Sequence, residues 1–204
     1  MTAYVLAALL GYALGCLNPA FLLGRLRGFD IRDIGSRNAG ASNALVTMGP
    51  KAAAAVGALD MGKACAAALL AAALFPGTPA AAAVAGAAAV LGHIFPFYMG
   101  FRGGKGFAPF LGMTLALDWR FFLALVAAVV VITLITDYIV IGTFASIVSV
   151  PAYLAFFVRA ERLAALAVAA ASVVIFAKHF VNIKRLLTGQ EIGLRRAMTK
   201  KDRV

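Results

Sequence analysis

Uncharged apolar stretches of about twenty residues recur along the whole of this 204-residue chain. A bilayer core is about 30 Å thick and takes roughly 20 apolar residues of helix to cross. Hydrophobic residues make up 63% of the chain and charged residues 13%, against about 45–50% and 25% in soluble domains. A water-soluble fold has no way to bury that much apolar surface. We therefore expect an all-α, polytopic membrane protein, with residues 1–204 forming a single membrane domain.

The apolar stretches divide into seven candidate spans, which predicts a seven-transmembrane-helix bundle. The fourth span is too short to cross a bilayer comfortably. A Pro-Gly-Thr-Pro cluster at 76–79 and a polar Asp-Trp-Arg step at 118–120 mark two of the turns between spans. The expected spans are 3–24, 51–75, 80–99, 104–117, 121–136, 139–158 and 163–187.

The basic residues are distributed unequally between the two sides of such a bundle. Only Arg120, Arg159 and Arg162 of the 19 lysines and arginines fall on one side. Because cytoplasmic loops are enriched in Lys and Arg, the N-terminus is expected outside and the C-terminus in the cytoplasm. The net charge is +11, but the lysines and arginines cluster between the apolar spans and form no basic stripe on a soluble face. Nucleic acid is therefore not an expected partner. The other side takes Arg25, Arg27, Arg32, Arg37, Lys51, Lys63, Arg102, Lys105, Lys178, Lys184, Arg185, Arg195, Arg196, Lys200, Lys201 and Arg203.

Three polar segments fall on the predicted cytoplasmic side, and the first runs from Ile34 to Asn43. Its hydroxyls and amides can donate hydrogen bonds to phosphate oxygens, and its glycines let backbone N–H groups approach a ligand. An ordinary turn with helix-capping residues accounts for the same pattern equally well. The candidate binding residues here are Gly35, Ser36, Arg37, Asn38, Gly40 and Asn43.

The second segment contains Gly92-His93-Ile94-Phe95-Pro96-Phe97 and the tetrapeptide 103–106. Gly103, Gly104 and Gly106 surround Lys105 just before an apolar run. Three glycines around one lysine are able to form an anion-binding nest at a helix N-terminus. The nucleotide P-loop is excluded, because that motif requires Gly where this chain has Met99, and Ser or Thr at position 106.

The third segment runs from His179 to Glu191 at the end of the last span. His179, Asn182 and Arg185 follow one another at intervals of three residues and share a helix face. Such a face in a membrane helix is a functional candidate, and an interfacial histidine bonded to water is the alternative for His179. We expect Glu191 to lie on a solvated or headgroup face together with the basic tail.

Inside the second span, Asp60 and Lys63 are three residues apart. An ion pair is the simplest way to tolerate both in a bundle.

These residues resemble the acyl-phosphate-dependent glycerol-3-phosphate acyltransferase family of bacterial membranes. The resemblance rests on G-S-x-N-x-G-A-[ST]-N at 35–43, on G-H-x-F-P-x-[FY] with G-G-K-G at 92–106, and on H-x-x-N-I-x-R-L-x-x-G-x-E at 179–191. It covers nearly the whole chain. The resemblance implies a seven-helix bundle in the bacterial inner membrane, with the active site on its cytoplasmic face.

The resemblance also implies a reaction. A fatty acyl group passes from acyl phosphate to the 1-hydroxyl of glycerol 3-phosphate, giving lysophosphatidic acid and phosphate as the first step of phospholipid synthesis. An enzyme that forms acyl phosphate would act upstream. No metal or other cofactor is implied, and the sequence shows no metal-ligand cluster.

The resemblance assigns roles to the motif residues. Gly103, Gly104, Lys105 and Gly106 are expected at the acyl phosphate or leaving phosphate. Ser36, Asn43, His179 and Asn182 are expected at the glycerol phosphate, with Lys105 touching both. The expected catalytic residues are His179, Asn182, Ser36 and Lys105.

No serine or cysteine has an obvious partnered base, so direct attack by the glycerol hydroxyl is more economical than an acyl-enzyme. Either His179 or a substrate phosphate oxygen serves as the base.

The chain departs from the family pattern at three positions. Val46 stands where the family has an arginine expected to contact glycerol 3-phosphate, and Arg37 stands where glycine is usual. Arg37 is a candidate to replace the missing charge from another direction. Pro109 stands where threonine is common, and it removes a hydroxyl and a backbone donor from the start of the fourth span.

These departures leave other functions open. One is a diverged paralogue with an altered acceptor. Another is a non-catalytic anion or phospholipid transporter, which would have polar residues along the whole bilayer depth. Here the polar motifs gather at one end, which favours an interfacial enzyme. A structural scaffold would leave the three phosphate-competent motifs unexplained.

Overall fold

The structure is a computed structural model that describes residues 1–158 and 160–198, and every regular element in that part of the chain is helical. Arg159, Lys200, Lys201 and Arg203, which entered the charge count, lie outside the described residues. The elements are α1 (Thr2–Cys16), α2 (Pro19–Leu26), α3 (Ala41–Met48), α4 (Pro50–Leu74), α5 (Ala81–Ile94), η1 (Phe97–Met99), α6 (Phe107–Leu117), α7 (Trp119–Thr136), α8 (Ile139–Ala152), η2 (Tyr153–Phe157), α9 (Arg162–Lys178), α10 (Phe180–Leu187) and α11 (Leu194–Met198).

Five helical runs are long and apolar enough to cross a membrane: Thr2–Leu26, Pro50–Leu74, Ala81–Met99, Trp119–Thr136 and Ile139–Phe157. The pair α9 and α10, bent by 46°, makes a sixth if it counts as one span. The fourth predicted span corresponds to α6, which has 11 residues and is short, as expected. The chain is thus a multi-pass helical protein with five or six spans of full length among the described residues.

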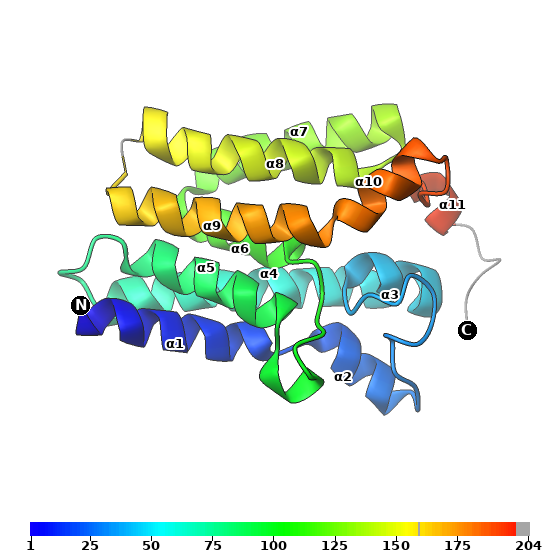
Figure 1. Cartoon of the computed structure of the whole chain (residues 1–204), viewed down its shortest axis with the longest axis horizontal. Coiled ribbons are helices and arrows are strands. Elements are labelled where there is room, and N and C mark those ends of the chain that lie inside the picture. The colour runs from blue at the N-terminus through cyan, green and yellow to red at the C-terminus, as the bar shows by residue number, and fades with distance from the viewer. Residues whose placement is uncertain (159, 199–204) are drawn as a thin grey trace.

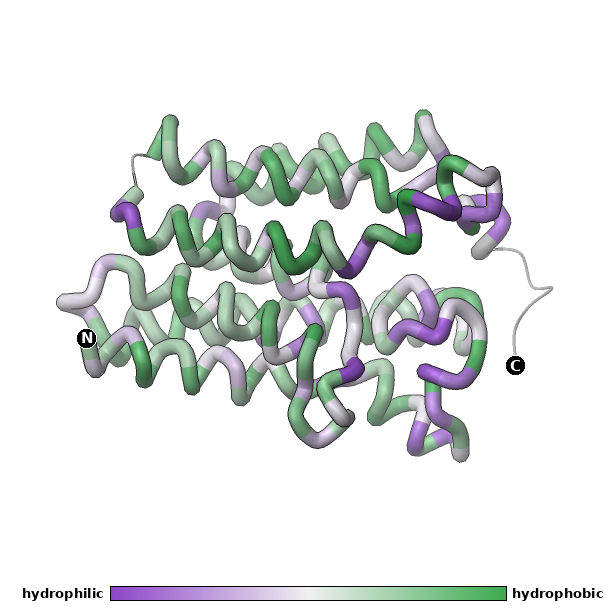
Figure 2. Tube along the Cα trace, viewed as in Figure 1, coloured by the Kyte–Doolittle hydropathy of each residue, from purple (hydrophilic) through white to green (hydrophobic). Residues whose placement is uncertain are grey.

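The long helices run side by side (Figure 1), and the N-terminus lies at the end of the bundle away from α3, α10 and α11. Figure 2 shows hydrophilic residues gathered mainly at the end that carries α10, α11 and the segment before α3. This is the one-sided distribution that the sequence predicted for the three polar segments.

Small residues let the helices approach closely in the half of the bundle near the N-terminus. A Cβ atom added to Gly11 of α1 would lie 2.0 Å from the Ala85 carbonyl oxygen of α5, and one added to Gly15 would lie 2.2 Å from that of Ala89. Helices α1 and α5 therefore pack through backbone contact, as small residues allow between membrane helices.

The first and last predicted spans are not continuous helices. The first is interrupted at Leu17 and Asn18, because Pro19 begins α2 and the Asn18 side chain caps that helix by accepting from Phe21 N at 2.9 Å. The last is interrupted at His179, between α9 and α10. The sequence did not predict the separate short helix α3. Both interruptions and α3 lie toward the hydrophilic end of the bundle (Figure 1).

Candidate functional site

The segment before α3 is held together by the side chain of Asn43. Asn43 is fully buried, and its Oδ1 accepts from Ser36 N at 2.8 Å. Its Nδ2 donates to the carbonyl oxygens of Ile31 at 2.9 Å and Ile34 at 3.1 Å. Gly35, at φ +59°, is required beside it, because a Cβ there would lie 2.3 Å from Asn43 Oδ1. Asn43 thus organises this loop from inside and lines neither of the two cavities described below, so its place at the glycerol phosphate stays a prediction.

The turn from Gly103 to Gly106 packs against the end of α5. The backbone N–H of Gly103 donates to Ile94 O at 3.0 Å, and that of Gly104 donates to His93 O at 3.1 Å. Both backbone donors are therefore already hydrogen-bonded within the chain, and the place of Gly103 and Gly104 at a phosphate stays a prediction. Gly106, at φ +91°, ends the turn as the N-cap of α6. The part of the predicted anion cradle that remains is the N-terminus of α6 beside Lys105.

His179 lies at the bend between α9 and α10 and is buried. Its Nδ1 is 2.8 Å from Ile175 O. A carbonyl oxygen only accepts hydrogen bonds, so Nδ1 carries the proton and the neutral ring keeps its lone pair on Nε2. That tautomer is the one a general base needs.

Lys105, Asn182 and Glu191 form a hydrogen-bonded chain. Lys105 Nζ donates to Asn182 Oδ1, and Asn182 Nδ2 donates to Glu191 Oε1 at 2.5 Å. Burial lowers the pKa of the Lys105 ammonium, and the Glu191 carboxylate partly offsets that effect. Glu191 is half-buried in this chain, so the expectation of a solvated or headgroup face is wrong for it.

The three predicted segments converge on a cavity of about 320 Å³, called here the larger cavity. Apolar residues from α3, α6 and α8 form much of its wall, and Val46 is among them. This convergence confirms that the segments share one site, and His179, Asn182 and Arg185 all face it, as their spacing predicted. The predicted residues that line it are Ser36, Asn38, Gly40, Lys105, Gly106, His179, Asn182 and Arg185.

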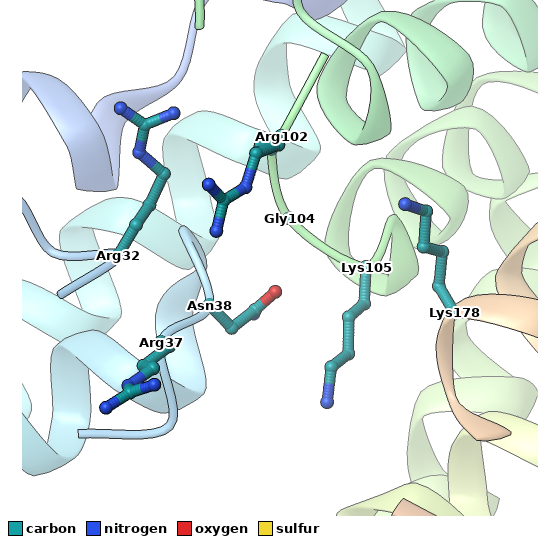
Figure 3. Close-up of a pocket in the computed structure, with 8 residues that line it drawn as sticks. Arg32, Arg37, Asn38, Arg102, Gly104, Lys105 and Lys178 are labelled. Carbon is teal, nitrogen blue, oxygen red and sulfur yellow. The ribbon is translucent and has the colours of Figure 1, made fainter. Parts of the chain in front are cut away.

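A second cavity of about 210 Å³, called here the cationic cavity, adjoins it and shares Asn38 and Lys105 with it. Figure 3 shows its side chains, with those from the segment before α3 on one side and Lys105 and Lys178 on the other. None of the described residues that line it is acidic, so it is suited to an anion. The lining residues are Arg32, Arg37, Asn38, Arg102, Gly103, Gly104, Lys105 and Lys178.

Arg32 is fixed in the wall of the cationic cavity by Asp30. Arg32 Nη2 donates to Asp30 Oδ2 at 2.7 Å, and its Nη1 donates to Met99 O at 2.7 Å. The hydrogen bonds from Arg32 lower the pKa of the Asp30 carboxyl to about 2. The guanidinium also lies 4.9 Å from the centre of the Phe21 ring. Arg32 is thus a preorganised cation.

Sequence reasoning used Arg32, Arg102 and Lys178 only for topology and left His93 without a role. The signal for Arg102 and Lys178 was their position next to a motif, since one immediately precedes Gly103 and the other immediately precedes His179.

Arg37, at φ +59°, lines the cationic cavity, whereas Val46 lines the larger one. Arg37 therefore does not take the place that an arginine at position 46 would occupy.

Taken together, the two cavities place a cluster of cations next to an apolar chamber. Lys105 lies between them, and a histidine with a free Nε2 lies in the wall of the larger one. Such an arrangement can hold a phosphate group, accept a proton from a hydroxyl and accommodate an alkyl chain.

Comparison with known proteins gives a consistent answer. The sequence profile of the family described as "Glycerol-3-phosphate acyltransferase" matches residues 5–189. A glycerol-3-phosphate acyltransferase of Brucella canis is 42% identical over 186 residues, which cover 91% of this chain and 90% of that protein. Glycerol-3-phosphate acyltransferase 1 of Oceanobacillus iheyensis is 33% identical over 209 residues, which cover 97% and 98%.

The fold is similar to that of a solved integral membrane enzyme. The crystal structure of PlsY, described as an integral membrane glycerol 3-phosphate acyltransferase in its glycerol 3-phosphate form, matches with a TM-score of 0.87 at 30% identity and covers 94% of this chain and 95% of that chain. Its lysophosphatidic acid form matches with a TM-score of 0.82 at 30% identity and covers 93% and 94%. With sequence, fold and site in agreement, the chain belongs to the glycerol-3-phosphate acyltransferase family and is an integral membrane acyltransferase of phospholipid synthesis.

Proposed function

We propose that this enzyme transfers a fatty acyl group from acyl phosphate to the 1-hydroxyl of glycerol 3-phosphate, giving lysophosphatidic acid and inorganic phosphate. The observation that carries the proposal is the pair of adjoining cavities with Lys105 and Asn38 in the walls of both. Both substrates carry a phosphate and one carries an alkyl chain, and the two cavities match those two chemistries. The solved PlsY structures are described as glycerol 3-phosphate and lysophosphatidic acid forms, which are an acceptor and a product of this reaction.

In the proposed reaction, the oxygen of the glycerol 1-hydroxyl attacks the acyl carbonyl carbon, and the bond between that carbon and the phosphate oxygen breaks. The hydroxyl proton passes to His179 Nε2 or to a phosphate oxygen. Lys105, bonded to Asn182, balances the charge that develops on the departing phosphate. Ser36 and Asn38, in the wall of the larger cavity, orient the acceptor.

The same proposal places the enzyme in the membrane. The chain crosses the bacterial inner membrane seven times, with α6 as the shortest crossing, the N-terminus outside and the C-terminus in the cytoplasm. The excess of lysine and arginine on one side supports this orientation. The active site then faces the cytoplasm, where an upstream enzyme that forms acyl phosphate supplies the donor.

The transporter alternative is less well supported. A conduit needs polar residues along the bilayer depth, whereas the hydrophilic residues gather mainly at one end of the bundle (Figure 2). A diverged paralogue with another acceptor is the stronger competitor, because Val46 gives the larger cavity an apolar wall at the position of the family's arginine.

The test is to incubate the purified protein with palmitoyl phosphate and glycerol 3-phosphate and to follow phosphate release and lysophosphatidic acid formation together. We expect both products in equal amounts, with no release when glycerol 3-phosphate is omitted. Release without dependence on glycerol 3-phosphate would reject this acceptor. Binding of both substrates without any product would favour the transporter.

A further inference from the structure

Three polar side chains that the proposed reaction does not use meet inside the bundle. Asp60 and Lys63 of α4 and His93 of α5 are 1%, 9% and 2% exposed. Burying ionisable groups in an apolar bundle is costly unless they are fully paired. Asp60 and His93 also line the larger cavity. The buried cluster is therefore in a position to support part of the wall of the larger cavity.

Lys63 is the centre of this cluster. Its Nζ donates to Asp60 Oδ1 at 2.7 Å and to the Leu17 carbonyl oxygen at 2.5 Å. That carbonyl lacks its usual helical donor, because Phe21 N donates to the Asn18 side chain instead. The third neighbour is His93 Nδ1, at 2.9 Å. The ammonium is thus surrounded by three polar atoms at hydrogen-bonding distance.

This geometry holds the His93 ring at Nδ1. With the ring proton on Nε2, Nδ1 accepts from the Lys63 ammonium at 2.9 Å, and with the proton on Nδ1 the ring donates to Asp60 Oδ1 at 3.1 Å. In either form the Asp60–Lys63 pair holds the ring in one orientation.

The fixed ring lies directly against the turn that carries Lys105. A Cβ atom on Gly104 would lie 2.0 Å from His93 Nε2, and one on Gly103 would lie 2.0 Å from the His93 carbonyl oxygen. The His93 carbonyl also accepts from Gly104 N. Both the backbone and the ring of His93 therefore contact the residue that immediately precedes Lys105.

We propose that His93, oriented by Lys63 and Asp60, is a positioning residue that sets the path of the Gly104–Lys105 backbone and thereby aims Lys105 at Asn182. This inference rests on the proposed function, in which Lys105 acts on the phosphate. It gives the buried cluster a role in the reaction besides its contribution to packing. The His93 ring, together with the Ala39 carbonyl oxygen 2.8 Å from the same Cβ position, leaves no room for a side chain at position 104.

The test is a double-mutant cycle of His93→Asn with Gly104→Ala, measured as kcat/KM for glycerol 3-phosphate. His93→Asn keeps an acceptor near the Nδ1 position for Lys63 but removes Nε2. We expect Gly104→Ala alone to lower kcat/KM about 100-fold, since a shift of about 1 Å is enough to cause such a loss. His93→Asn alone should lower it about tenfold. The double variant should be no worse than Gly104→Ala, because the nearest obstructing atom is gone and only the Ala39 carbonyl oxygen, at 2.8 Å, still meets the new Cβ.

Gly103→Ala is the matched control. Its Cβ would meet the His93 backbone oxygen and Pro96 Cδ, and His93→Asn removes neither. The losses of His93→Asn and Gly103→Ala should therefore multiply. Losses that also multiply for the Gly104 pair would overturn the proposal, and so would equal coupling in the two pairs.

Amide hydrogen exchange tests the positioning role of His93 without depending on enzyme turnover. In Lys63→Met, exchange of the Gly103–Gly106 amides should rise at least about tenfold if the ring loses its anchor. Lys51→Met, at an exposed position in the first turn of the same helix, should leave exchange of these amides unchanged. Unchanged exchange in Lys63→Met would reject the positioning role. If wild-type protein shows no turnover, the proposed function fails, while the exchange result still decides the role of His93 and Lys63.

Discussion

Lys105 and Asn182, which are 77 residues apart in the sequence, are joined by a hydrogen bond from the lysine ammonium to the amide oxygen. The contact connects the turn before α6 to α10. The amide nitrogen of Asn182 in turn donates a hydrogen bond to the Glu191 carboxylate. The ammonium is therefore held in place before any substrate binds, and preorganised charge of this kind is a large contributor to catalysis.

Replacing Lys105 by methionine should lower kcat/KM for both substrates about 100- to 1,000-fold, because one preorganised donor is lost at the departing phosphate. Lys184→Met is the control, since Lys184 is exposed on α10 and lies over the Phe180 ring away from both cavities. Steady-state kinetics of the two variants makes the comparison. Equal activities would show that Lys105 has no role in the reaction.

His179→Gln should lower kcat about 100-fold or more, because the substitution removes the Nε2 lone pair that would take the hydroxyl proton. The pH dependence of kcat decides between the two candidate bases. Loss of the acidic limb in the variant assigns the base to His179. Normal turnover with an unchanged pH profile would leave a substrate phosphate oxygen as the base.

Arg37→Ala should raise KM for glycerol 3-phosphate about tenfold and leave kcat nearly unchanged, because the cationic cavity loses one of its charges. Arg27→Ala removes an exposed arginine that lines neither cavity, and its kinetic constants should match those of the wild type. If Arg37→Ala leaves the KM for glycerol 3-phosphate unchanged, Arg37 does not compensate from the cationic cavity for the arginine that is absent at position 46.

Asp30→Asn should lower the melting temperature in detergent at pH 7 by about 2–4 °C, the shift expected for a loss of about 1 kcal/mol in a chain of this size. The pKa of Asp30 is lowered to about 2 from 3.8. The carboxylate therefore stabilises the fold above about pH 4, and this contribution is lost as the pH falls from about 4 to 2. Thermal unfolding as a function of pH measures the difference between the two proteins. A difference of undiminished size at pH 2 would rule out the Asp30 charge as its origin.

Much of this molecule could be predicted from the sequence. The helix positions follow from hydropathy, and the convergence of Ser36, Lys105 and His179 follows from motifs that share one side of the bundle. The direction of a side chain in a loop was not predictable in the same way. Asn43 turns inward because Ile31 and Ile34 offer carbonyls to it, and the Gly104 N–H is occupied because the His93 carbonyl lies beside it. Both outcomes depend on contacts that no local pattern encodes.

The bend of 46° at His179 also determines where the reacting groups lie. Beyond it, α10 exposes Phe180, Val181 and Leu187, while Asn182 and Arg185 line the larger cavity. A helix with two such faces rests in the boundary between headgroups and acyl tails. We therefore expect α10 to lie in that boundary and to fix the depth of the reacting groups. At this depth a donor dissolved in lipid and an acceptor dissolved in water can meet while each stays in its own phase.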